Sequence, residues 1–113
     1  MKIAIIGSRE LGESCYGHLC AAVPAEASEI VSGGAQGVDR LAERYAGENN
    51  LKMTVIRPDY DTYGGQAPLV RNAEIVSAAD YVLVLWNGES RGSLHVIMTC
   101  MRTNKPFKAL LIR

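Results

Sequence analysis

The sequence has no excess of charge of either sign. Lysine and arginine together number 12, as do aspartate and glutamate, so the formal net charge at pH 7 is zero. Proteins that bind nucleic acid through an extended surface usually carry a strong positive balance. The neutral balance argues against such a surface, although it leaves room for a local basic patch.

Cysteine is scarce, and its spacing fits no metal site. The three cysteines, Cys15, Cys20 and Cys100, are an odd number and form no CxxC pair. A disulfide framework or a structural zinc site needs a different pattern. Cys15 and His18 have the spacing of one helix face, but two ligands do not make a structural metal site. We therefore expect reduced thiols and no bound metal.

Long hydrophobic runs are also missing. No apolar run approaches the roughly 20 residues that a membrane-spanning helix needs. The first ten residues, MKIAIIGSRE, have neither the length nor the small-residue cleavage site of a signal peptide. We therefore expect no membrane partner, and a cytoplasmic location is the default.

The composition is that of one ordinary folded domain. Hydrophobic residues make up 48% and charged residues 21% of the 113 positions, which is close to the average of globular proteins. A chain of this length can bury one sizeable core but not two. We therefore expect a single domain over residues 1–113.

Short apolar runs alternate with helical patterns along the whole chain. The runs predict strands at residues 2–6, 29–32, 52–56, 81–86 and 109–112. Helices are expected at 11–23, from 38 to about 47, from 68 onward, and from about 94 to 105. This alternation predicts an α/β fold, a three-layer α/β/α sandwich with a parallel sheet of about five strands.

The segment between Arg57 and Pro68 is polar, rich in turn-forming residues and long for a connection. Long ordered connections in compact domains often act as lids or binding loops. Tyr60 and Tyr63 in this segment either stack on a base or pack the loop against the body. Packing is the simpler interpretation.

The second predicted strand runs into three glycines, Gly33, Gly34 and Gly37, before the next helix begins. The free N–H groups and the positive dipole end at a helix start attract an anion such as phosphate. Glycines also let a ligand approach the backbone closely. The alternative is that they only make a tight turn. Asp39, in the first helical turn, is either a helix-start residue or a ligand contact.

Two other strands also end in small polar residues. Ser8 and Arg9 follow the first strand, and residues 88–93 follow the fourth. Ser90 and Ser93 can each cap the next helix or bind a phosphate oxygen. Because the carboxyl ends of parallel strands lie at one edge of the sheet, we expect all three turns to meet there.

Arg71 and Asn72 lie near the start of the predicted helix that begins at about Pro68. The helix dipole disfavours a cation at this place. An arginine there suggests an anionic partner such as a ligand phosphate.

Two familiar nucleotide motifs are absent. The segment GSRELGES has the glycine spacing of a P-loop, but Glu13 stands where the motif needs lysine. Arg9 replaces the second glycine of the dinucleotide fingerprint, and no acidic residue ends the second strand to bind a ribose hydroxyl. We therefore expect neither a Walker-type NTPase nor an ordinary NAD site.

Four segments together, GSR, SGGAQGVDRLAERYA, YGGQAPLVRNAEIV and LWNGESRGS, resemble the SLOG superfamily of Rossmann-like proteins. This superfamily joins the DNA-processing Smf/DprA domain to the lysine-decarboxylase-like or lonely-guy phosphoribohydrolases. The chain is most similar to its small stand-alone nucleotide-binding members, over nearly its whole length. The resemblance implies a Rossmann-like fold, a nucleotide or nucleotide-derived ligand, no required cofactor, and a homodimer.

The resemblance also implies which residues contact the ligand and its phosphate. They are Gly7, Ser8, Arg9, Gly33, Gly34, Gly37, Asp39, Arg71, Asn72, Ser90, Gly92 and Ser93. The phosphoribohydrolase motif PGGxGTxxE contains a glutamate that this chain lacks; His95 lies two residues after Gly92-Ser93 instead. Glu89 and His95 are the remaining, weak candidates for acid–base catalysis.

These observations favour a nucleotide-binding module that acts as a sensor or in processing. The alternative is a hydrolase that cleaves an N-glycosidic or phosphate-ester bond of a nucleotide. A DprA-like single-stranded DNA-binding module is a further alternative, which the neutral charge disfavours. The apolar positions Leu94, Met98 and Met101 either pack on the sheet or form a homodimer surface.

Overall fold

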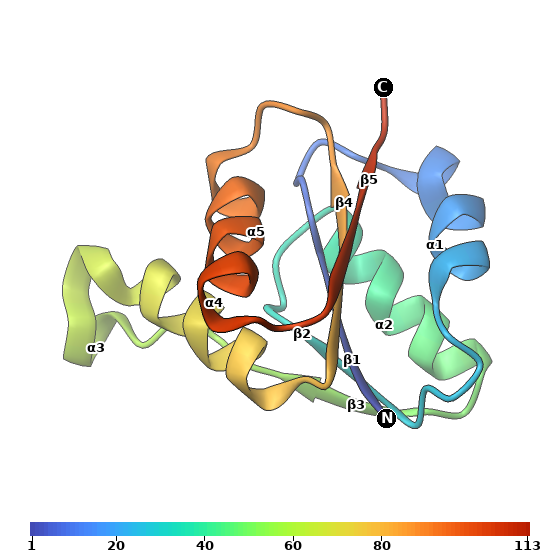
Figure 1. Cartoon of the computed structure of the whole chain (residues 1–113), viewed down its shortest axis with the longest axis horizontal. Helices are drawn as coiled ribbons and strands as arrows, with labels where there is room; N and C mark the ends of the chain where they lie inside the picture. The colour runs from blue at the N-terminus through green and yellow to red at the C-terminus, as the bar shows by residue number, and fades with distance from the viewer.

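The computed structural model describes all 113 residues and contains one sheet of five parallel strands (Figure 1). The strands are β1 (Lys2–Gly7), β2 (Glu29–Ser32), β3 (Lys52–Val55), β4 (Tyr81–Trp86) and β5 (Phe107–Leu111). Their order in the sheet is β3-β2-β1-β4-β5, and every neighbouring pair is parallel. The predicted five-stranded parallel sheet is therefore confirmed.

Helices cover both faces of the sheet, which confirms the three-layer, Rossmann-like architecture (Figure 1). The helical elements are η1 (Glu13–Cys15), α1 (Tyr16–Ala22), α2 (Val38–Glu48), α3 (Tyr60–Tyr63), η2 (Gly64–Gln66), α4 (Ala67–Ala78) and α5 (Arg91–Thr103). Helices α1 and α2 lie on one face, and α4 and α5 lie on the other. None of these helices has the length and apolar character needed to cross a membrane.

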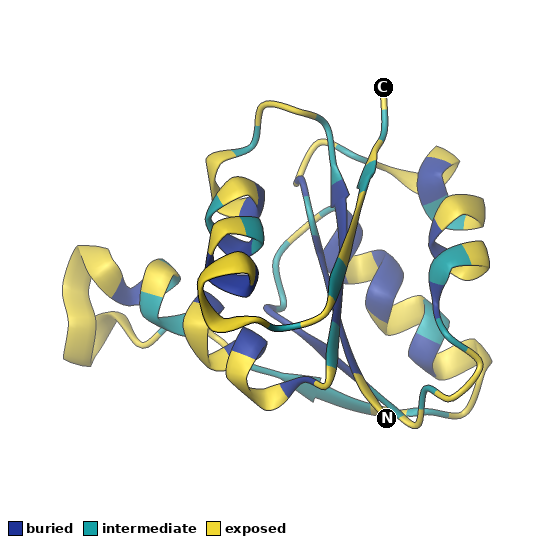
Figure 2. Cartoon of the chain, in the orientation of Figure 1, coloured by how far each residue is buried: buried dark blue, intermediate teal, exposed yellow.

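The central strands β1 and β4 are buried on both faces, as their continuous apolar sequences predict (Figure 2). Ile3 and Ile5 of β1 pack in the cluster under α1 and α2. Ala4 and Ile6 alternate with them and pack in the cluster under α4 and α5. This two-faced burial holds the middle of the sheet rigid, so the strand ends can position a site.

Two predicted segments differ from the structure. The helix expected from residue 11 begins only with the short η1 turn, and Leu11 and Gly12 precede it. The connection after Arg57 contains α3 and η2, and α3 protrudes from the body (Figure 1). The side chain of Asp59 explains this helix, because it accepts a hydrogen bond from the Thr62 N–H and caps the first turn.

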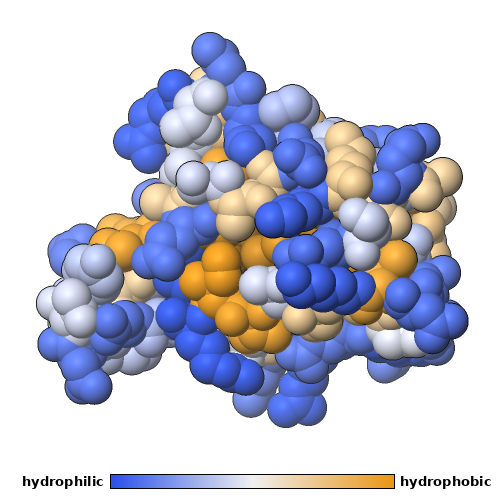
Figure 3. Space-filling view, turned by 90° about the horizontal axis from the view of Figure 1, so that it is seen from below, coloured by the Kyte–Doolittle hydropathy of each residue, from blue (hydrophilic) through white to orange (hydrophobic).

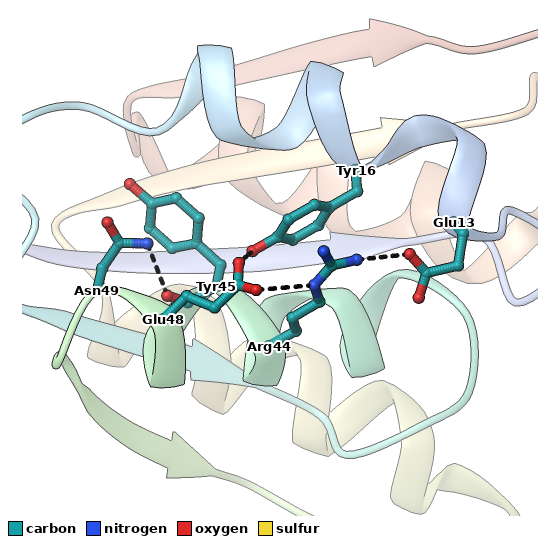
Figure 4. A network of polar contacts seen from close by, with 6 residues as sticks. All are labelled: Glu13, Tyr16, Arg44, Tyr45, Glu48 and Asn49. Carbon is teal, nitrogen blue, oxygen red and sulfur yellow. Dashed lines mark hydrogen bonds and ion pairs between the residues drawn. The ribbon is translucent and has the colours of Figure 1, made fainter.

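A polar network joins η1 and α1 to the outer side of α2 (Figure 4). The Arg44 guanidinium lies 3.9 Å from the ring centre of Tyr16 and pairs with Glu13 at 2.6 Å and Glu48 at 3.2 Å. The Tyr16 hydroxyl also donates to Glu48. Hydrogen bonds from Tyr16 and Arg44 lower the pKa of Glu48. The network ties the chain after β1 to α2. Its two glutamates neutralise the charge of Arg44.

The strand order reverses between β1 and β4, which lie side by side at the centre of the sheet. The chain leaves β1 toward the α1–α2 face and leaves β4 toward the α4–α5 face. In open α/β sheets this divergence leaves a crevice at the carboxyl ends of the two strands, where ligands bind. The opposite end of the molecule, seen from below in Figure 3, shows an apolar area within a mainly hydrophilic face.

Candidate functional site

A cavity of about 430 Å³ opens where β1 and β4 end, and it is called the main cavity here because most of the predicted ligand-contact residues line it. Its lining comes from the turns after β1, β2 and β4 and from the first part of α4. Ten of the twelve residues expected to contact a ligand line it: Gly7, Ser8, Arg9, Gly33, Asp39, Arg71, Asn72, Ser90, Gly92 and Ser93. The predicted convergence of the turns at one edge of the sheet is therefore present in the structure.

Ser8 joins the ends of the two central strands. Its backbone N–H donates to the Leu85 carbonyl at 3.1 Å, and its hydroxyl oxygen accepts from the Asn87 N–H at 3.1 Å. Only 1% of Ser8 is exposed. Ser8 thus fixes the turn after β1 against the loop after β4, and its hydroxyl proton is available to donate.

Arg71 is held in place from two sides. Its Nη1 donates to the Gly33 carbonyl at 2.9 Å, and its Nε donates to Asn72 Oδ1 at 2.9 Å. A Cβ on Gly33 would lie 2.6 Å from Arg71 Nη1, so the glycine makes room for the guanidinium. Arginine carries five N–H groups, and these two bonds leave the others for a ligand in the cavity.

Asp39 is a buried carboxylate at the start of α2. Its Oδ2 accepts from the Ala35 N–H at 3.0 Å, whereas its buried Oδ1 has no hydrogen-bond partner. Burial raises the pKa of Asp39, and the Ala35 N–H and the charge of Arg71 act in the opposite direction. The Gly34 N–H donates to Ser32 Oγ. Two N–H groups of this glycine turn are therefore already used within the chain.

Replacing Asp39 by asparagine should make stability less dependent on pH. Burial favours the protonated carboxyl in the folded state, so this stabilisation is complete below the ordinary pKa of 3.8 and is lost as pH rises through the raised value. Asp39→Asn should therefore be more stable than the wild type at neutral pH, and this advantage should shrink toward about pH 4.

Urea unfolding at several pH values measures this difference, with Glu74→Gln on α4 as the control for losing one negative charge. An asparagine variant less stable than the wild type at neutral pH would contradict the expectation. It would show that the bond from Ala35 and the charge of Arg71 outweigh the cost of burial.

The loop after β4 is organised by Asn87. Its Oδ1 accepts from the N–H groups of Glu89 and Ser90, both at 2.9 Å, and its Nδ2 donates to Glu10 at 3.2 Å. Ser90 then caps α5, and its Oγ accepts from the Ser93 N–H at 3.3 Å. Gly92 lines the cavity in the first turn of α5, where an N–H group has no acceptor within the helix.

The family follows from comparison with known proteins. The model of the YspA, cpYpsA-related SLOG family, YAcAr, matches residues 1–63, more than half of the chain. The chain belongs to this SLOG family. The family assignment confirms the resemblance that the four sequence segments indicated.

A curated relative of this SLOG protein is the Gene 61 protein of Mycobacterium phage D29. It is 37% identical over 79 residues, which cover 65% of the chain and 60% of the phage protein. The chain therefore spans less than two thirds of that relative.

Two solved structures of DNA processing protein A share the fold of the SLOG protein. The Helicobacter pylori protein, described by its single-stranded DNA binding mode, has a TM-score of 0.78 and 23% identity. The Streptococcus pneumoniae protein has a TM-score of 0.81 and 21% identity. The matches cover 100% and 99% of this chain but 66% and 50% of those proteins. At these identities, the likeness shows the fold.

Sequence reasoning missed several residues of the SLOG protein's cavity. They are Ile6, Glu10, Ala35, Pro68, Ile75 and Asn87. Asn87 had a local signal, because an asparagine followed by glycine directly after a strand is typical of a turn held by its side chain. Glu10 had none, since its place depends on its contact with Asn87 across 77 positions of sequence.

Some predicted residues lie outside the main cavity. Gly34 and Gly37 do not line it, and neither does His95, whose pKa is lowered by burial and by the charge of Arg102. Tyr60 and Tyr63 are 59% and 46% exposed on α3, so they do not pack against the body as expected. Of the two acid–base candidates, only Glu89 reaches the cavity.

The apolar positions on α5 do not pack on the sheet. Leu94, Met98 and Met101 are 40%, 50% and 64% exposed. This removes one of the two interpretations of these residues and leaves the homodimer surface as a prediction.

Proposed function

We propose that this SLOG protein binds a nucleotide or nucleotide-derived phosphate ligand in the main cavity. The observation that carries the proposal is the meeting of two arginines, Arg9 and Arg71, with the open first turn of α5 at the strand-order reversal. Phosphate groups bind at helix N-termini because free N–H groups and the helix dipole both favour an anion. Arg71, held by two hydrogen bonds, supplies a cation of fixed orientation.

The carboxylates that line the cavity favour a ligand that carries hydrogen-bond donors as well as a phosphate. Three carboxylates, from Glu10, Asp39 and Glu89, line it with the two arginines. Carboxylates accept hydrogen bonds but repel a second anion. Sugar hydroxyls and base amines donate such bonds, so a nucleotide fits this lining better than inorganic phosphate or a chain of phosphates.

A panel of nucleoside monophosphates, cyclic nucleotides and ADP-ribose derivatives should contain at least one compound that raises Tm by several degrees. Binding stabilises the folded state by about 2.7 kcal/mol at a hundredfold excess over Kd. The matched variants are Gly92→Asp and Gly92→Asn, because a Cβ at Gly92 meets nothing within 4 Å. This free space should let both variants fold, and the aspartate also suits the helix dipole in the first turn.

The shift should persist in Gly92→Asn and disappear in Gly92→Asp, because the new carboxylate would repel the ligand phosphate. A panel that shifts no Tm in the wild type would refute the proposal. Equal shifts in both variants would place the phosphate away from α5.

A second candidate function is binding of single-stranded DNA, as in the H. pylori relative. A shallow hollow beside the main cavity, here called the arginine hollow, contains Arg40, Arg57 and the ion-paired Arg44, together with Glu43. Ala35 lines both the main cavity and the arginine hollow, so the two adjoin and a DNA strand can extend from one to the other. Binding of a labelled oligonucleotide that weakens steeply with salt would favour this function over the nucleotide.

A further inference from the structure

Another hollow, here called the side hollow, adjoins the main cavity at the ends of β4 and β5. It is an open depression of about 670 Å³ and shares Glu10, Asn87 and Glu89 with the main cavity. In Figure 1 the two strands end together at the top, where the loop to α5 begins. The two hollows therefore adjoin at these three residues, so a ligand in the main cavity lies next to the side hollow.

The two hollows differ in chemistry. Three of the 17 residues that line the main cavity are hydrophobic, against four of nine in the side hollow. Those four are Leu11, Trp86, Leu111 and Ile112. The main cavity therefore offers charge and hydrogen bonds, whereas the side hollow offers an apolar surface next to them.

Hydrogen bonds and strand pairing hold this apolar surface. Trp86 and Leu111 are paired in register on β4 and β5, and the Ile112 N–H donates to the Trp86 carbonyl at 2.8 Å. The indole Nε1 of Trp86 donates to the Ser90 carbonyl at 3.0 Å, which fixes the ring against the loop that leads to α5. Leu111, the last residue of the edge strand β5, is apolar but 51% exposed.

We propose that the side hollow binds the planar base of the nucleotide whose phosphate occupies the main cavity. This inference depends on the proposed function and adds where the base lies. A base needs a flat apolar contact for its face and polar partners for its edge. Trp86 and Leu111 offer the first, and the carboxylates of Glu10 and Glu89 offer the second at the boundary between the hollows.

The test compares ribose 5-phosphate with AMP, GMP and UMP by calorimetry and by the fluorescence of Trp86, the single tryptophan. At least one base-bearing probe should bind about tenfold or more tightly than ribose 5-phosphate, because stacking on an aromatic residue contributes substantially per base. That probe should also change the Trp86 emission beyond the change that ribose 5-phosphate causes.

The matched variants are Leu111→Asn and Met98→Asn. Both residues are about half exposed, at 51% and 50%, but Met98 lies outside both hollows. Leu111→Asn should lose most of the preference for the base-bearing probe while its affinity for ribose 5-phosphate stays the same. Met98→Asn should match the wild type with every probe.

The outcomes separate this inference from the function on which it depends. The side-hollow assignment would be overturned if ribose 5-phosphate and the base-bearing probes bound with equal affinity. It would also be overturned if Leu111→Asn kept the preference for a base-bearing probe. Either result would leave the proposed nucleotide-phosphate site standing. No binding of any probe by the wild type would overturn both.

Discussion

Gly7→Ala should destabilise the protein by about 2–3 kcal/mol and lower Tm by roughly 10 °C. Gly7 is the last residue of β1, at the floor of the main cavity. A Cβ there would lie 2.4 Å from the Leu85 carbonyl oxygen and 2.5 Å from Val38 Cγ2. Neither neighbour can move freely, because Leu85 belongs to a central strand and Val38 is fully buried at the start of α2.

The matched control is Gly17→Ala in α1, where a Cβ meets nothing within 4 Å. Alanine favours a helix over glycine by up to about 1 kcal/mol, so this variant should be as stable as the wild type or more so. Urea unfolding of both variants measures the difference. A Gly7→Ala protein of wild-type stability would show that β1 and α2 can move apart without cost.

The strands of this fold were predictable because a strand that is buried on both faces has a continuous apolar sequence. The four central positions of each of these strands, Ile3–Ile6 in β1 and Val82–Leu85 in β4, are all apolar because helices cover both sides of the sheet there. The ends of helices were less predictable. The start of α3 depends on two hydrogen bonds that the side chain of Asp59 accepts from Thr62. The late start of α1 depends on how the chain leaves β1.

The glycine turn shows why only part of the site could be read from the sequence. Gly33 makes room for Arg71 and lines the cavity, whereas Gly37 has a φ of +71° and faces the Arg9 carbonyl, where a Cβ would lie 2.5 Å away. In the sequence these two glycines look alike, and only the fold distinguishes Gly33, which lines the main cavity, from Gly37, which makes the turn. The turn interpretation is thus confirmed for Gly37, and the approach of a ligand at Gly33 stays a prediction.

Asp39 and Glu10 illustrate the same limit for charged residues. A carboxylate in a first helical turn suits the helix dipole, but its burial and its free Oδ1 depend on the packing of the turn after β2. Glu10 reaches the site through Asn87, far away in the sequence. Residue type and local spacing predict which turns meet, and tertiary contacts decide which side chains share the cavity.

Arg71→Gln should weaken binding of a phosphate-bearing nucleotide by roughly tenfold to a hundredfold. Hydrogen bonds from a charged donor contribute about 1.5–3 kcal/mol, and the variant loses both the charge and the fixed guanidinium. It should also lose stability at neutral pH, since the charge of Arg71 lowers the pKa of the buried Asp39 and its Nη1 holds the Gly33 carbonyl.

Arg57→Gln is the matched control, because Arg57 also donates to a glycine carbonyl, that of Gly34, but lies in the arginine hollow outside the main cavity. Calorimetry of both variants with the strongest-binding nucleotide should show a loss of affinity only for Arg71→Gln.

An equal loss of affinity in both variants, accompanied by oligonucleotide binding that also depends on Arg57, would instead indicate a ligand that extends from the main cavity into the arginine hollow. A strand of DNA fits that result and a single nucleotide does not, so this pair of variants separates the two candidate functions by the position of the charge that each requires.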